Sequence, residues 1–150
     1  MTLERFYIPF VAEPQKLMTW TGVTTFDEAH LTARGVSRQI VEALRLAPRY
    51  GVEIVSPQVE VSCKGNRLFS QVMHLKIGGH PVRAYGTVSL DGTMEYWVDF
   101  LPTEGLVGAE WFPALRNERI KVPLIGTARE PHLDMDTLNA EIARLKRERN

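Results

Sequence analysis

Turn residues between positions 58 and 101 constrain the fold of this chain most. Three short breaks separate four stretches that are rich in apolar and β-branched residues: Lys64-Gly65-Asn66, Gly78-Gly79 and Asp91-Gly92. Glycine and asparagine tolerate the positive φ angles that tight hairpin turns require. The pattern therefore predicts an antiparallel β-meander over residues 58–101, with strands at about 58–63, 68–77, 81–90 and 94–101.

The side chains of these strands indicate how the strands pair, because a one-residue slip would turn apolar residues to the wrong face. A two-residue loop at Gly78-Gly79 places Leu75 opposite Val82. A three-residue loop ending at Gly92 places Ala84 opposite Val98 and Tyr96 opposite Gly86. By the same reasoning we expect Phe69 to face both Val61 and Val88. The resulting apolar face is predicted to hold Val59, Val61, Phe69, Met73, Leu75, Val82, Ala84, Val88, Met94, Tyr96, Val98 and Phe100, with Gln71 as a buried amide among them.

An apolar sheet face needs a cover, and a predicted helix precedes the meander. Thr25-Phe26-Asp27-Glu28 fits a capping box, an apolar stripe follows it, and Pro48 ends the helix. Asp134 or Asp136 is expected to cap a C-terminal helix. We therefore predict a single α+β domain over residues 1–150, in which the antiparallel meander (58–101) curls over a main helix (26–47), with a C-terminal helix at 135–148. Further strands are predicted at 4–11, 17–24 and 118–125, and residues 102–117 form a long loop.

The charge balance excludes several classes of function. The chain has 18 Lys and Arg residues and 18 Asp and Glu residues, so its formal net charge is zero. Proteins that coat nucleic acids or anionic membranes usually carry a clear basic excess, and nucleic acid is therefore an unlikely partner. A single cysteine, Cys63, gives no internal disulfide, and neither a signal-like N-terminus nor an apolar run of 18 residues is present. We expect a cytoplasmic protein without membrane segments.

The face of the sheet opposite the apolar one is predicted to be mixed. The expected register places His74, Arg83 and Asp99 in one cross-strand row and Tyr85 beside Trp97 in the next. The first row is either an anion-binding or acid–base group, or an ordinary cross-strand ion pair. The aromatic pair is a contact platform for a protein, a base-stacking surface, or a site covered by the C-terminal helix.

Motif searches identify no catalytic site. The chain has no Gly-rich phosphate loop, no Gly-x-Ser-x-Gly elbow, no His-Glu-x-x-His and no paired cysteines. Oxygen and imidazole groups gather between Glu130 and Asp136, but acidic residues before a helix are expected as caps. We therefore predict no catalytic residue, no cofactor and no metal.

Two functions remain open. The favoured one is a non-enzymatic protein-binding module, of accessory or inhibitor type, whose partner is another protein or a second copy in a homodimer. It would act through the mixed sheet face and the 102–117 loop, with contacts from His74, Arg83, Tyr85, Trp97, Asp99, Trp111 and Phe112. The alternative is a small-molecule-binding protein or enzyme with a pocket between helix and sheet, where Gln71 and Tyr96 would contact the ligand.

Overall fold

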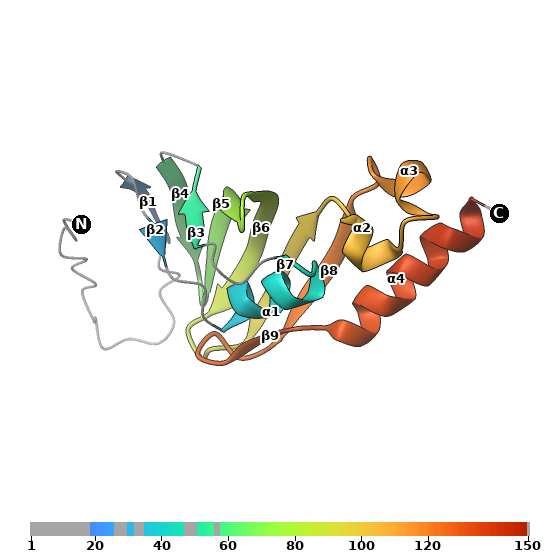
Figure 1. The fold of residues 1–150 in the computed structure, drawn as a ribbon. Coiled ribbons are helices and arrows are strands. Elements are labelled where there is room, and N and C mark those ends of the chain that lie inside the picture. Colours follow the sequence, from blue (N-terminus) through green and yellow to red (C-terminus); the bar gives the residue numbers. More distant parts are fainter. Residues whose placement is uncertain (1–18, 26–29, 32–34, 47–50, 56–57, 150) are drawn as a thin grey trace.

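The computed structural model describes residues 19–25, 30–31, 35–46, 51–55 and 58–149. Within these ranges the chain forms one antiparallel sheet of nine strands and four helices (Figure 1). The strands are β1 (Thr19–Thr25), β2 (His30–Leu31), β3 (Val52–Ile54), β4 (Gln58–Lys64), β5 (Arg67–Ile77), β6 (His80–Ser89), β7 (Met94–Phe100), β8 (Ile120–Gly126) and β9 (Pro131–Leu133). The helices are α1 (Val36–Ala43), α2 (Glu104–Val107), α3 (Phe112–Leu115) and α4 (Met135–Glu148).

The meander is the centre of the sheet. The strand order is β1-β4-β5-β6-β7-β8-β9, and the short strand β3 pairs with both β5 and β2. Strands β4 to β7 are neighbours in the order in which the chain makes them, so the predicted α+β architecture with an antiparallel meander is confirmed.

One face of the sheet carries the core. Helices α1 and α4 pack on this inner face, through Ile40 of α1, the C-cap residue Leu44, and Leu138 and Leu145 of α4. Figure 1 shows α1 in front of the strands, and α2, α3 and α4 grouped at the β8 end. The inner face is defined by Leu75, Val82, Ala84, Tyr96, Val98, Phe100, Ile120, Val122 and Leu124.

The predicted register is confirmed in β6 and β7 and corrected in β5. Leu75 lies opposite Val82, and Ala84 opposite Val98, as expected. A β-bulge between Ser70 and Met73 then shifts the pairing by one residue. Phe69 consequently faces Thr87 instead of Val88, and its side chain leaves the inner face. Phe69 also faces Ser62 instead of Val61, because Lys64 pairs with Arg67 and the turn between β4 and β5 has two residues, Gly65 and Asn66, instead of three. The bulge inserts one extra residue on β5, which strict alternation of apolar residues does not reveal.

The main helix is shorter than predicted. His30 and Leu31 form β2, and α1 begins at Val36 after Gly35, whose φ is 54°. The expected helix over 26–47 is wrong at its start because Leu31 pairs with Val52 in the sheet, and because the positive φ of Gly35 interrupts helical geometry. The predicted capping residues 26–28 and Pro48 lie outside the described residues, as does the predicted strand at 4–11.

The remaining elements agree better with expectation. β1 and β8 occupy most of the strands predicted at 17–24 and 118–125, and β9 was not predicted. The side chain of Asp134 accepts hydrogen bonds from the backbone N–H groups of Asp136 and Thr137, which confirms it as the cap of α4. The long 102–117 loop contains α2 and α3.

Gly86 lies at a point where two strands of the sheet approach each other closely. A Cβ atom at Gly86 would lie 2.3 Å from the carbonyl oxygen of Glu95 and 2.6 Å from Cα of Tyr96, and the φ of Gly86 is 152°. The backbone of β7 therefore occupies the space that any side chain at this position would need.

We expect Gly86→Ala to lower the free energy of unfolding by at least about 3 kcal/mol, because strain at φ and a backbone clash add together. Urea denaturation followed by circular dichroism measures the change. Gly79→Ala is the matched control, since Gly79 has a φ of 76° but open space around it, and it should cost about 1–2 kcal/mol. Equal losses in the two variants would contradict the clash.

Candidate functional site

The candidate site lies on the outer face of the sheet, which is the face away from α1 and α4. Its central residues form two rows, in which each residue pairs with a residue of the neighbouring strand. His74, Arg83, Asp99 and Lys121 follow one another in the first row, and Tyr85, Trp97 and Pro123 follow one another in the second. The predicted rows His74–Arg83–Asp99 and Tyr85–Trp97 are thus confirmed, and no helix of the described chain covers them.

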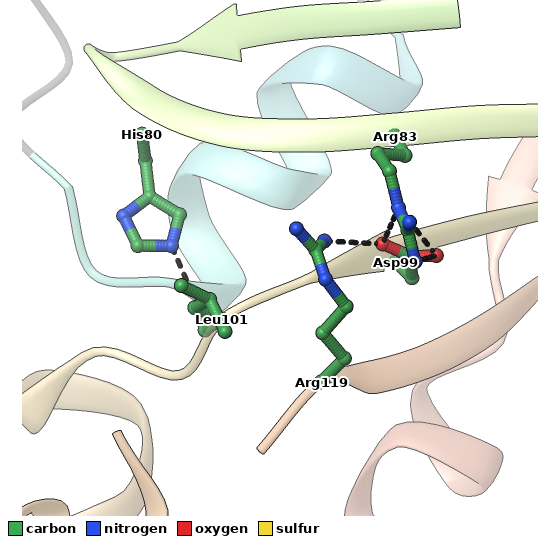
Figure 2. Close-up of polar contacts among 5 residues, drawn as sticks. All are labelled: His80, Arg83, Asp99, Leu101 and Arg119. Carbon is green, nitrogen blue, oxygen red and sulfur yellow. Dashed lines mark hydrogen bonds and ion pairs between the residues drawn. The ribbon is translucent and has the colours of Figure 1, made fainter. Parts of the chain in front are cut away.

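Asp99 is the only buried charged or polar residue in the described part of the chain, with 3% of its surface exposed. Nε of Arg83 donates to Oδ1 at 2.8 Å, and Nη2 of Arg83 donates to Oδ2 at 2.7 Å. Nη1 of Arg119 donates to Oδ1 at 2.6 Å. Figure 2 shows the two guanidinium groups converging on the carboxylate from different sides. We call these three residues the Asp99 clamp.

The clamp keeps Asp99 ionised. Burial alone would raise the pKa of this carboxyl group, but the hydrogen bonds from Arg83 and Arg119 outweigh it, so the pKa of Asp99 lies below its ordinary value. The hydrogen bond to Asp99 likewise raises the pKa of Arg83. The positions of both guanidinium groups are fixed by a carboxylate that solvent barely reaches.

A hydrogen bond from β6 holds the backbone at the end of β7, beside the clamp. Nε2 of His80, at the start of β6, lies 2.6 Å from the carbonyl oxygen of Leu101 in a hydrogen bond that closes the two strands together (Figure 2). This contact supports the backbone two residues beyond Asp99. It therefore stabilises the position from which the carboxylate holds both arginines.

Lys121 adds a third cation next to the clamp. Its Nζ lies 4.3 Å from the ring centroid of Trp97 and 5.4 Å from that of Tyr85. A cation above an aromatic face is attracted by the negative charge density of the ring. We refer to Arg83, Arg119 and Lys121 as the cationic corner; it sets three positive charges against the single carboxylate of Asp99.

The outer face also carries exposed apolar side chains. The register places Val23 and Phe69 on the outer face, in line with Glu60 and Thr87 respectively, and Ile125 pairs with His132 there. Val23, Phe69, Val72 and Ile125 expose between 38% and 60% of their surface. Exposed apolar groups gathered on one face are typical of a contact surface.

The structure separates the predicted site residues into two groups. Arg83, Tyr85, Trp97 and Asp99 are together, and His74 is exposed in the same row. Trp111 and Phe112 are half-buried and pack against the core on the inner side, and Nζ of Lys146 lies 5.6 Å from the Trp111 ring. The aromatic residues of the 102–117 loop therefore do not extend the outer face.

The residues of the alternative site have partners within the protein. The expectation that Gln71 is buried is wrong: it lies in the bulge, is exposed, and its Oε1 accepts a hydrogen bond from the backbone N–H of Glu60. The hydroxyl of Tyr96 lies 2.8 Å from Oγ of Ser70. The predicted ligand pocket between helix and sheet was based on a buried amide at Gln71, and Gln71 is not buried.

Arg119 and Lys121 were not predicted as site residues. The sequence feature that could have identified Lys121 is the alternation of residues 118–125. Together with the pairing of β7 with β8, this alternation places Lys121 on the outer face. No short turn sets that pairing, because 19 residues separate Phe100 from Ile120.

In the described ranges no cluster of three or more His, Cys, Asp or Glu residues could hold a metal ion. No helix of the described chain is long and apolar enough to cross a membrane. Comparisons with protein families, curated proteins and solved structures found no match to this chain.

We expect Asp99→Asn to lower the free energy of unfolding by about 1–3 kcal/mol at pH 7, since two arginines lose their anion but remain partly solvated. Because the folded pKa of Asp99 is depressed, its stabilising contribution is complete above the unfolded pKa of about 3.9 and is lost as the pH falls through the folded pKa. Urea denaturation of both proteins between pH 7 and pH 2.5 should show the difference shrinking only below about pH 4. Glu110→Gln, at an exposed loop position, is the control and should change stability by less than about 0.5 kcal/mol. A difference between Asp99→Asn and the wild type that stays constant to pH 2.5 would contradict the proposed linkage.

Proposed function

We propose that this protein is a non-enzymatic binding domain whose outer face docks an acidic segment of a partner protein. The observation that supports the proposal is the juxtaposition of Tyr85 and Trp97 with the cationic corner, beside a single buried carboxylate. A chain of zero net charge has concentrated three cations beside two half-buried aromatic rings at one place on the sheet.

The residue types match those that dominate protein interfaces. Tryptophan, tyrosine and arginine are enriched among the few residues that supply most of the binding free energy. Here all three types stand on neighbouring strands, whose pairing holds them in fixed relative positions. Little conformational entropy is then lost on binding, so more of the contact energy appears as affinity.

The positive charge of the corner supports an acidic partner. Excess positive charge on a surface accelerates association with acidic partners and disfavours basic ones. A symmetric homodimer through this face would bring Arg83, Arg119 and Lys121 of both copies into one interface, where like charges repel. We therefore favour a different, acidic protein over a second copy.

Nucleic acid fits this face less well. Base stacking needs an open aromatic surface, whereas Lys121 lies over the rings of both Trp97 and Tyr85. The overall charge of the chain is also neutral, which would give only a small electrostatic contribution to binding of a phosphate backbone. An accessory or inhibitor role toward an acidic protein in the cytoplasm is the form of the function that we propose.

The test measures binding of a fluorescent eleven-residue peptide in which glutamate and glycine alternate around a central serine. Lys121→Glu should weaken binding by at least about tenfold, because it reverses a charge within the cationic corner. Trp97→Ala should weaken binding as well, through loss of the aromatic surface. Fluorescence anisotropy at fixed ionic strength gives the dissociation constants.

The matched control is Lys146→Glu, which makes the same change of charge at a lysine that also lies over a tryptophan, but on the inner side. It should change peptide affinity by less than about twofold. Equal losses at Lys121 and Lys146 would show that only net charge matters. Tighter binding of an oligonucleotide than of the peptide, or a homodimer that Lys121→Glu dissociates, would also overturn the proposal.

A further inference from the structure

We propose that the cationic corner is a subsite for a phosphomonoester on the partner protein, so that phosphorylation of the partner controls docking. This inference rests on the proposed function, since it identifies the group that occupies one part of the same face. Its support is the charge, the free hydrogen-bond donors and the fixed geometry of Arg83, Arg119 and Lys121.

The charge of the corner matches a phosphomonoester better than a carboxylate. Three cations and the ionised Asp99 leave an excess of two positive charges. A phosphorylated side chain carries a charge of about −1.5 to −2 at pH 7, whereas a glutamate carries a single negative charge. A carboxylate would therefore leave positive charge uncompensated at the interface.

The arginines retain donors for a ligand. The bonds to Asp99 use Nε and Nη2 of Arg83 and Nη1 of Arg119. Within the described chain no acceptor engages Nη1 of Arg83, or Nε and Nη2 of Arg119. The side chains are 36% and 39% exposed, so these groups can reach a ligand from solvent. Arginine donors in a fixed fork suit the oxygens of a phosphoryl group.

Asp99 acts here as a positioning residue. It lies beneath both guanidinium groups and is almost fully buried, so it orients them without presenting its own charge to solvent. Phosphopeptide recognition by arginine clusters depends on several such donors meeting at one point. The side-chain entropy of two long arginines is already lost in the free protein, which favours binding.

The experiment compares three peptides, in which the central residue of the glutamate–glycine peptide is serine, phosphoserine or glutamate. The phosphoserine peptide should bind at least about tenfold more tightly than the glutamate peptide. Its advantage should decline as the pH falls from 7.5 to 5, because the second pKa of a phosphomonoester is about 6. Nuclear magnetic resonance should show the Nε–H signals of Arg83 and Arg119 and the indole N–H of Trp97 shifting with the phosphopeptide.

Two variants distinguish a phosphate subsite of fixed geometry from nonspecific electrostatic attraction. Asp99→Asn adds one positive charge to the protein, so attraction alone would strengthen binding of the phosphopeptide, whereas loss of the orienting carboxylate should weaken it by at least about threefold. Arg119→Lys keeps the charge and removes the fork, and it should reduce the preference for phosphoserine over glutamate by about fivefold. Arg147→Lys, at an exposed position on α4, is the control and should leave the preference unchanged.

The outcomes distinguish this inference from the proposed function. Equal affinities for the phosphoserine and glutamate peptides would overturn the phosphate subsite and leave acidic docking intact. Failure of the serine peptide to bind, together with displacement of the phosphopeptide by inorganic phosphate at equal concentration, would overturn both. Tighter binding to phosphatidylcholine vesicles that contain phosphatidic acid than to the phosphopeptide would assign the corner to a lipid headgroup and overturn the inference.

Discussion

Alternation of side chains along three paired strands, β6, β7 and β8, is the constraint on which the rest of the structure depends. Successive residues of a strand point to opposite faces, so one register decides the contents of both. Val98 and Phe100 turn inward to the helices, and the same register turns Trp97 and Asp99 outward. The core and the candidate site are therefore two consequences of one pairing, and neither could shift without the other.

The burial of Asp99 on an outer face is unusual for this arrangement. A lone carboxylate with so little exposure would be strongly destabilised, and charged groups buried in proteins are normally paired. Arg83 of β6 and Arg119, which directly precedes β8, supply the pairing, and each keeps part of its own side chain in water. The cost of desolvation is thus confined to one small anion, while the cations stay available at the surface.

Sequence reasoning predicted the parts of the molecule that local turns determine. The Gly78-Gly79 hairpin and the turn ending at Gly92 fix the pairing of β5, β6 and β7 nearby, and with it the positions of Arg83, Tyr85, Trp97 and Asp99. Arg119 and Lys121 follow a long connection through α2 and α3, so no local signal places them beside Asp99. The predicted main helix was too long because capping and periodicity report only local preferences. The pairing of Leu31 with Val52 joins residues far apart in the sequence, and it places Leu31 in a strand instead of a helix.

The bulge in β5 has a consequence for how this face can change. Upstream of it, Phe69 lies outside and Ser70 reaches the Tyr96 hydroxyl on the inner face; strict alternation would exchange the two positions. Loss of one residue at Gln71 or Val72 would therefore turn an aromatic ring from the outer face into the core, and a hydroxyl outward. Insertions and deletions in this strand act on the composition of both faces at once, which makes the length of β5 as much a determinant of the outer surface as the identity of its residues.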